Sequence, residues 1–480
     1  MNTAHWSATK LIRALKAKKL GALELLDYYA ARIKRFDGVL NALPILDMDA
    51  ARKRAKALDR KGAKAGPLAG LPMTVKESFD LAGYPTTWGL AEYANTAAKT
   101  NAVAVQRLFD AGANVFGKSN VPTLLADWET VNVVYGKTVS PWDHQRTPGG
   151  SSGGAAAALA AGLTGLEVGS DIGGSIRNPA HFCGIYGHKS TWGVCSMAGS
   201  ALPGAVHPTD ISVIGPMGRS AADLELGLSV IAGPDAIDGR GWKADLPKCG
   251  RKTLDGWRVA VIANHPTAEV DSTVEHSIRR LAQFLSSRGA KVSERALPEF
   301  DFGEAHRVFI QLLRGATSGR QTPEQFADML AAKAKLDPND QGYYAQMVRA
   351  NTQPHRDWLI ASNRRHQMRL AWAEFFKEWD VLLCPNGATA AYPHSMPGER
   401  WERMITVNGK PQPLTTQMWW AGISGMCYLP GTAAPIGLSP EGLPLSVQIV
   451  GPQYADLHTI RFAQLLEREY YAFAPPPAYA

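Results

Sequence analysis

Hydrophobic positions in the first sixty residues follow a helical period. Leu11, Ile12 and Leu15 fall on one face after Ser7, which can cap a helix N-terminus. Two further helices are predicted over about residues 23–36 and 47–61. The Lys and Arg clusters in these stretches are typical of solvated helix faces and do not by themselves indicate nucleic-acid binding. We therefore predict an N-terminal helical segment over residues 1–65.

The pattern changes after residue 66, where short apolar runs alternate with helical ones. Residues 71–75 and 114–116 predict strands, whereas 102–111 and 154–161 predict helices. The same alternation continues downstream, with strands expected over 257–262, 290–295, 380–384 and 445–450 and helices over 272–286 and 457–469. Alternating strands and helices favour an α/β fold built around a sheet.

Residues 303–379 differ from their flanks, because they form an irregular, aromatic-rich helical region. No internal repeat and no low-complexity linker separates this region from the rest of the chain. We predict a single domain over residues 1–480, with a core over 66–225 and a helical insert over about 303–379.

Composition narrows the class of protein further. The chain is 45% hydrophobic and 20% charged, which excludes a disordered protein, and a net charge of +8 over 480 residues is a weak reason to expect nucleic acid as a partner. Five scattered cysteines without a CxxC predict reduced thiols and no metal knuckle. The N-terminus lacks the apolar run of a secretory signal, and the uncharged stretch 147–166 is too weakly hydrophobic to span a bilayer. We expect a cytoplasmic protein without a spanning segment.

One run, Gly112 to Ser119, satisfies the P-loop pattern. A P-loop needs its glycine loop after a strand and before a helix, so that backbone N–H groups can surround a phosphate. Here a helix precedes Gly112, and Asn114 to Phe116 reads as the strand itself. Pro122 follows soon after, so nucleotide binding is not favoured.

A second run, Gly149 to Gly153, matches the G-x-S-x-G nucleophile elbow. An elbow requires a strand directly before it. The preceding residues 142–148 read as a turn, which argues against an α/β-hydrolase.

Lys76, Ser151 and Ser175 form a stronger set of candidates. Lys76 ends an apolar strand, where poor solvation favours its neutral form. Ser151 and Ser175 lie in two Gly/Ser loops on either side of one Ala-rich helix, and the glycines before Ser175 can aim consecutive N–H groups at one point. The residues alone thus suggest a Ser/Lys acyl-transfer site, with structural turns as the alternative.

These residues belong to longer runs that resemble the amidase signature family. The most specific run is 147–179, and further matches cover 70–77, 117–122, 135–138, 210–223, 380–385 and 442–451. The resemblance extends over nearly the whole chain. It implies an α/β fold with a large mixed central β-sheet covered by helices on both faces, and a site at the edge of that sheet.

The resemblance also implies roles for individual residues. Ser175 would be the nucleophile, Ser151 the bridging serine after a cis peptide bond, and Lys76 the base. The oxyanion hole would consist of the backbone N–H groups of Ile172, Gly173, Gly174 and Ser175. No metal or organic cofactor is expected, and Asp171 and Arg177 would brace the loop.

Substrate specificity is the least determined property. The resemblance places Leu125, Asp127 and Trp128 in the substrate pocket, and Asp127 departs from the small uncharged residue common there. Aromatic residues could form an apolar wall, although core packing is the alternative: Phe309, Tyr343, Tyr344, Trp358, Trp372, Trp419 and Trp420.

The predicted activity is hydrolysis of a neutral, medium-sized aryl or alkyl amide, in preference to half-amides of dicarboxylic acids, with esterase or carbamate-cleaving side activity. The alternatives are a nylon-oligomer or cyclic-amide hydrolase, and the A-subunit of glutaminyl-tRNA amidotransferase, which works in a complex. Self-association as a homodimer is left open.

Overall fold

The N-terminal segment forms the three helices that the hydrophobic period predicts: α1 (Ala8–Lys16), α2 (Ala22–Leu40) and α3 (Met48–Lys61). Ser7 caps α1 by accepting a hydrogen bond from the Lys10 N–H, and Asp47 caps α3 in the same way. The computed structural model describes residues 3–394 and 396–480, so residues 1 and 2 of the predicted segment lie outside it.

A small sheet follows, with β3 (Asn114–Ser119) between β1 (Ile45–Leu46) and β2 (Pro72–Lys76). Helix α4 (Val103–Asp110) leads into β3, which runs parallel to β2. The P-loop-like residues Gly117 to Ser119 are therefore part of a buried strand, and the Lys118 ammonium donates to the Pro85 carbonyl. This arrangement leaves no glycine loop to hold a phosphate.

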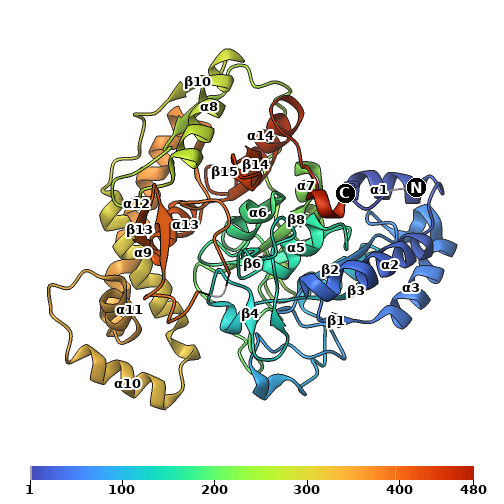
Figure 1. Cartoon of the computed structure of the whole chain (residues 1–480), viewed down its shortest axis with the longest axis horizontal. Helices are drawn as coiled ribbons and strands as arrows, with labels where there is room; N and C mark the ends of the chain where they lie inside the picture. The colour runs from blue at the N-terminus through green and yellow to red at the C-terminus, as the bar shows by residue number, and fades with distance from the viewer. Residues whose placement is uncertain (1–2, 395) are drawn as a thin grey trace.

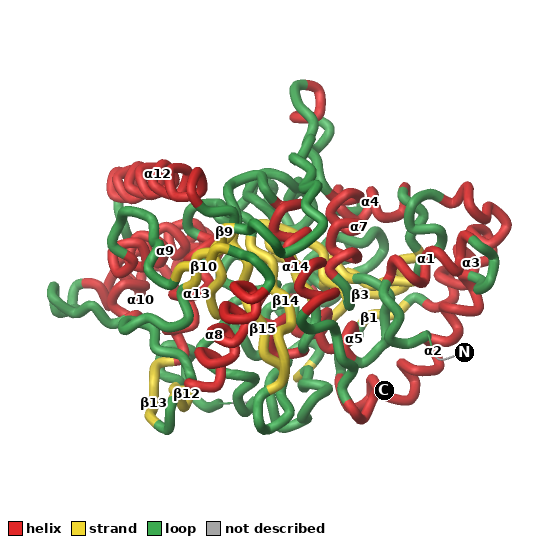
Figure 2. The backbone as a smooth tube through the Cα atoms, turned by 90° about the horizontal axis from the view of Figure 1, so that it is seen from above, coloured by secondary structure: helices red, strands yellow, loops and turns green. Residues whose placement is uncertain are grey.

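The main sheet has eight strands in the order β10-β9-β11-β15-β14-β7-β8-β6. Their bounds are β6 Glu167–Asp171, β7 Tyr186–Lys189, β8 Val213–Gly218, β9 Arg258–Val261, β10 Lys291–Ser293, β11 Val381–Pro385, β14 Gly431–Leu438 and β15 Pro444–Val450. Strand β9 is parallel to β10 and β11, whereas the other neighbours are antiparallel, so the sheet is mixed as predicted. Figure 2 shows these strands at the centre of the molecule, between helices.

The helices packed near this sheet are α5 Gly153–Ala160, α6 Arg177–Cys183, α7 Ala221–Ile231, α8 Ser272–Ser287 and α14 Asp456–Glu469. They cover both faces, as two polar contacts demonstrate. Thr432 of β14 contacts Thr459 of α14 and pairs with Ile449 of β15. Because side chains alternate along a strand, the adjacent Gln448 points to the opposite face, where Arg177 of α6 donates to it.

A helical region and two small hairpins complete the fold. The region contains α9 Phe302–Thr317, α10 Pro323–Lys333, α11 Tyr343–Asn351 and α12 His355–Glu378, followed later by α13 Gln417–Gly425. The hairpins are β4 (Val131–Asn132) with β5 (Gly136–Lys137), and β12 (Met404–Val407) with β13 (Lys410–Pro413). Helices α9 to α12 lie at one end of the molecule and α1 to α3 at the other (Figure 1). Within the described part of the chain, no helix is both long enough and apolar enough to cross a membrane.

The edges of the two sheets meet, and this contact places the candidate site. Strand β6 is an edge of the eight-stranded sheet and β2 is an edge of the small one. The Thr74 hydroxyl of β2 donates to the buried Glu167 carboxylate of β6, and the Thr74 N–H donates to Thr164. The C-terminal end of β2, with Lys76, therefore lies against β6, which leads into Ser175.

Candidate active site

Lys76 is fully buried at the C-terminal end of β2. Its Nζ lies 2.7 Å from Ser151 Oγ and 3.0 Å from Ser170 Oγ. Burial lowers the pKa of Lys76 to about 7, although Asp171, Glu167 and Glu77 each pull it upward. The amine is therefore available as a base at neutral pH, one hydrogen-bond length from a serine hydroxyl.

Ser151 lies in the tight loop before α5, and the peptide bond from Gly150 to Ser151 is cis, as the resemblance implies. No strand leads into this loop, so the nucleophile-elbow interpretation does not hold. A Cβ on Gly150 would stand 2.3 Å from the Asp127 carbonyl oxygen. Only glycine fits so close to another backbone, which explains one glycine of the run.

Ser175 follows β6 and is 6% exposed, whereas Lys76 and Ser151 are essentially inaccessible. The Ser152 N–H donates to the Ser175 carbonyl at 3.1 Å, which joins the two serine loops. A cavity of about 20 Å³ is lined by Ser151, Ser170 and Ser175 together. The structure thus brings the three predicted residues to one place, with the candidate nucleophile outermost.

The Ser175 loop is held by a buried ion pair. Asp171 accepts hydrogen bonds from the backbone N–H groups of Gly174 and Ile176, and Arg177 Nη2 contacts it at 2.8 Å. Burial alone would raise the pKa of Asp171, but Arg177 outweighs it and holds that pKa well below its ordinary value. Both residues are therefore occupied with each other and with the loop, in agreement with the predicted bracing role.

The predicted oxyanion donors differ in their availability. The Gly174 N–H already donates to Asp171 Oδ1 at 2.9 Å. The N–H groups of Ile172, Gly173 and Ser175 donate to no acceptor among the described residues. Gly174 instead contributes its conformation, since its φ of 95° is one that other residues rarely adopt. The N–H groups of Ile172, Gly173 and Ser175 therefore remain the candidates to receive an oxyanion.

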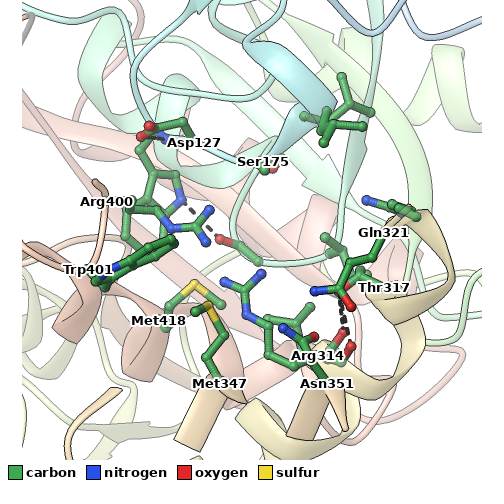
Figure 3. Close-up of a pocket in the computed structure, with 18 of the residues that line it drawn as sticks. Asp127, Ser175, Arg314, Thr317, Gln321, Met347, Asn351, Arg400, Trp401 and Met418 are labelled. Carbon is green, nitrogen blue, oxygen red and sulfur yellow. Dashed lines mark hydrogen bonds between the residues drawn. The ribbon is translucent and has the colours of Figure 1, made fainter. Parts of the chain in front are cut away.

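A cavity of about 320 Å³ opens beside Ser175 (Figure 3). Its walls come from the loop after β3, the Ser175 loop, helices α9 to α11, the segment around residues 400–401 and α13. The helical region predicted over 303–379 therefore contributes directly to the cavity, through residues such as Leu313, Thr317 and Met347.

The three predicted pocket residues all line this cavity, but in different ways. Leu125 presents an apolar side chain. Trp128 donates its indole N–H to the Gly173 carbonyl at 3.0 Å, which fixes the ring against the candidate oxyanion loop. The Asp127 carboxylate accepts from the Trp128 N–H at 2.7 Å and from Arg403 at 2.8 Å, so it is engaged within the protein.

Most of the aromatic residues considered for a wall belong to the core instead. Phe309, Trp372 and Trp420 are at most 1% exposed. None of the seven lines the cavity, where the aromatic surface comes from Trp128 and Trp401. Arg314, Arg320, Arg400 and Met418 also line it and were not anticipated, because their segments are remote in sequence from the serine loops.

Two buried histidines and the cysteines are structural. His181 contacts Ser446, and His188 lies between Thr432 and Asp456. The cysteines are free thiols, and burial raises the pKa of Cys195, Cys384 and Cys427 to about 12. These three buried thiols are therefore protonated and unreactive near neutral pH.

Comparison with known proteins decides the family. The amidase family model matches residues 24–460, which is most of the chain. The chain belongs to the amidase family. Solved structures agree on the amidase signature fold: a bacterial aryl acylamidase of the amidase signature enzymes superposes with a TM-score of 0.81 at 23% identity, over 100% of this chain and 98% of that one.

Curated relatives of this amidase differ in what their names describe. The indoleacetamide hydrolase of Bradyrhizobium diazoefficiens is 31% identical over 94% of this chain and 84% of that protein. The A-subunit of the glutamyl-tRNA(Gln) amidotransferase from Deinococcus radiodurans is also 31% identical, over 97% of both chains. The human fatty-acid amide hydrolase 2 is 29% identical over 98% of this chain and 90% of that protein. These relatives are about equally similar to this chain, although their names describe different substrates. The comparison therefore establishes the family and the chemistry at a C–N bond, but not the substrate.

Proposed function

We propose that this amidase hydrolyses the C–N bond of medium-sized linear amides with an aryl or alkyl body, through an acyl-enzyme on Ser175. The observation that carries the proposal is the connection of Lys76 to Ser151 at 2.7 Å, beside a Ser175 that opens into a cavity of about 320 Å³. Acyl transfer needs a nucleophile, a base and an oxyanion site within reach of one bound carbonyl. All three have candidates here.

The proton follows the serines in the proposed mechanism. Neutral Lys76 accepts the proton of Ser151 as Ser151 accepts that of Ser175, and Ser175 Oγ attacks the amide carbon. The Gly173 and Ser175 N–H groups stabilise the negative charge on the carbonyl oxygen. The proton then returns through Ser151 to the departing nitrogen, the C–N bond breaks and the amine leaves. Water repeats the sequence on the ester and releases a carboxylic acid and free Ser175.

The apolar walls of the cavity favour an amide with a larger apolar body than that of glutamine. Leu124, Leu125, Leu313, Met329, Met347 and Met418 line it beside Ser175. An aryl or alkyl body gains stability by leaving water for such walls, whereas the short polar body of glutamine gains little. Esters and carbamates with a similar body present the same carbonyl to Ser175 and are expected as side substrates.

The test is product release by the purified chain alone, with an aryl anilide, a fatty primary amide, glutamine and an aryl carbamate as substrates. We expect turnover of the anilide or the fatty amide, and a loss of roughly 10⁴-fold or more in Ser175→Ala. Turnover of glutamine alone, or only after a partner is added, would favour the role in an amidotransferase complex. Turnover that survives in Ser175→Ala would exclude the acyl-enzyme.

A further inference from the structure

Three arginines line the cavity beside Ser175. Arg314 comes from α9, Arg320 from the short helix that follows it, and Arg400 from the segment before β12. Figure 3 shows the guanidinium groups of Arg314 and Arg400 pointing into the cavity from these two separate segments. Arg320 also lines the smaller cavity that holds Ser151 and Ser175.

Among the described residues, none of the three arginines forms a salt bridge with a carboxylate. Arg314 and Arg400 both contact the Tyr343 hydroxyl, and Arg320 lies over the Trp88 ring at 5.0 Å. Asp127 is the nearby acid, but its carboxylate is held by Arg403 at 2.8 Å. The Arg314 Nε is buried without an acceptor within that described part of the chain.

This situation, at three half-buried arginines, differs from that of two fully buried arginines that have an acid beside them. Arg177 is paired with Asp171 at 2.8 Å, and Arg365 with Asp210 at 2.7 Å. A guanidinium stays charged in a protein, so unpaired ones held together repel each other and lack their natural acceptors. Burial lowers the pKa of Arg320 to about 10, and the nearby Arg314 adds a smaller contribution in the same direction.

The cavity therefore has two chemical parts: an apolar part beside Ser175 and a cationic part in which no carboxylate of the described residues pairs with the three arginines. The two arginines Arg314 and Arg400 lower the pKa of the Tyr343 hydroxyl that they contact, although burial alone would raise it. Planar guanidinium groups match a carboxylate in shape and charge, often through two parallel hydrogen bonds. A bound carboxylate would supply acceptors in addition to the Tyr343 hydroxyl, including one for the Arg314 Nε.

We propose that the preferred substrates are amides whose apolar body ends in a carboxylate, held by Arg314 and Arg400 while Ser175 attacks the amide. The proposal rests on the proposed amidase function and narrows its substrate class. It replaces the sequence-based preference for an uncharged substrate, because these arginines were not part of that argument.

The test uses three 4-nitroanilides with the same six-carbon acyl chain. The adipic acid monoanilide ends in a carboxylate, the hexanoic anilide in a methyl group and the 6-aminohexanoic anilide in an ammonium group. Release of nitroaniline is measured for the wild type, Arg314→Gln, Arg400→Gln and the double variant. Arg307→Gln is the matched control, since Arg307 is exposed on the same helix α9 and does not line the cavity.

We expect kcat/KM to rank carboxylate, methyl, ammonium in wild type and Arg307→Gln. Each cavity variant should lose roughly 10- to 100-fold for the carboxylate substrate, mainly through a higher KM, and little for the methyl one. Equal losses for the carboxylate and methyl substrates in the variants would overturn the proposal and leave these arginines with a structural role alone. Equal kcat/KM for the two substrates would overturn it for a carboxylate on the acyl part, and the amine part is tested by the second pair of substrates.

A binding measurement separates this proposal from the catalytic one. Ser175→Ala is titrated with the adipic monoanilide and with the hexanoic anilide, and the rise in melting temperature is recorded. The anion site is supported if only the carboxylate compound raises the melting temperature of Ser175→Ala, and if this rise is lost when Arg314→Gln and Arg400→Gln are added. This result would hold even if no anilide were hydrolysed. No preference for the carboxylate compound contradicts an anion site for the acyl part, whereas anilide hydrolysis without that preference leaves the amidase proposal intact.

The body that carries the carboxylate can be the acyl part or the amine part. A second pair of substrates, 4-acetamidobenzoate and 4-acetamidotoluene, places the charge on the amine part. A preference for the carboxylate in this pair instead of the adipic series would assign the arginines to the leaving group. A preference in neither pair would contradict the proposal.

Discussion

Lys76 determines the pH at which the proposed relay can work. Its pKa is lowered to about 7 by burial, from an ordinary value of 10.5. A base must be unprotonated to accept the Ser151 proton, so activity is present above this pKa and is lost as pH falls through it. We expect kcat/KM to rise with pH around a midpoint near 7 and to reach a plateau above about 8.

The measurement is kcat/KM for a neutral anilide between pH 5.5 and 9.5. Circular dichroism at each pH serves as the control. The pKa of Lys76 is lower in the folded than in the unfolded protein, so the stability of the fold also decreases as pH drops from 10.5 towards 7. The control therefore distinguishes a loss of activity by unfolding from one by protonation of Lys76. A kcat/KM that does not change with pH between 5.5 and 9.5, with the fold intact, would contradict Lys76 as the base.

The sequence predicted the catalytic candidates better than the pocket, for a physical reason. Ser151 and Ser175 lie in runs of glycine and serine that indicate tight loops. Lys76 ends an apolar strand. All three residues therefore stand out in the local sequence. Arg314 and Arg400 stand in ordinary helical and loop sequence. Only the folded chain brings α9 and the segment before β12 to one cavity with Ser175, and no local sequence pattern indicates that arrangement.

At the scale of elements, the β6–α6 connection depends on one carboxylate. Asp171 holds the Ser175 loop through two backbone N–H groups and through Arg177. Asp171→Asn keeps the size of the side chain but leaves Arg177 buried beside a neutral amide. Breaking a buried pair in this way costs about 3–5 kcal/mol of stability. We expect a kcat lower by on the order of 10²-fold as well, because the loop that aligns Ser175 loses support.

Chemical denaturation and steady-state kinetics of Asp171→Asn check this prediction. Asp143→Asn is the matched control, since Asp143 pairs with Arg146 at 3.1 Å while both side chains are about a third exposed. Such a pair contributes at most about 1 kcal/mol. If the two variants lost the same stability, Asp171 would not be the brace that its contacts indicate.

Elements with a strong local signal were predicted, and those that depend on neighbours were not. The helices α1 to α4 follow a clear hydrophobic period with recognisable ends. Strand β6 reads Glu-Val-Gly-Ser-Asp and lacks an apolar run, so it becomes a strand only because β8 pairs with it. The β12–β13 hairpin was missed although Asn408 and Gly409, both at positive φ, form the turn pair that favours hairpins.

At the scale of the molecule, one apolar core runs from α1 to α14 and includes helices α9, α12 and α13. The sequence predicts a single domain. Because the parts of a single domain share one core, they are expected to unfold together. We expect guanidinium denaturation curves followed by far-UV circular dichroism and by fluorescence of the 13 tryptophans to coincide.

The Arg365–Asp210 pair provides a sharper test, because it joins α12 to the loop before β8. Arg365 is 2% exposed and lies 2.7 Å from Asp210. Arg365→Gln should lower stability by about 1–3 kcal/mol and shift both denaturation curves equally, since the loss is shared by one cooperative unit. Arg364→Gln is the control on the same helix, because Arg364 pairs with Glu304 inside the helical region and both are over a third exposed.

An early transition of the helical region alone in Arg365→Gln would mean that the cavity wall folds separately from the serine loops. In that case the cavity beside Ser175 could open without unfolding of the core, and the carboxylate preference proposed for it should weaken in the same variant.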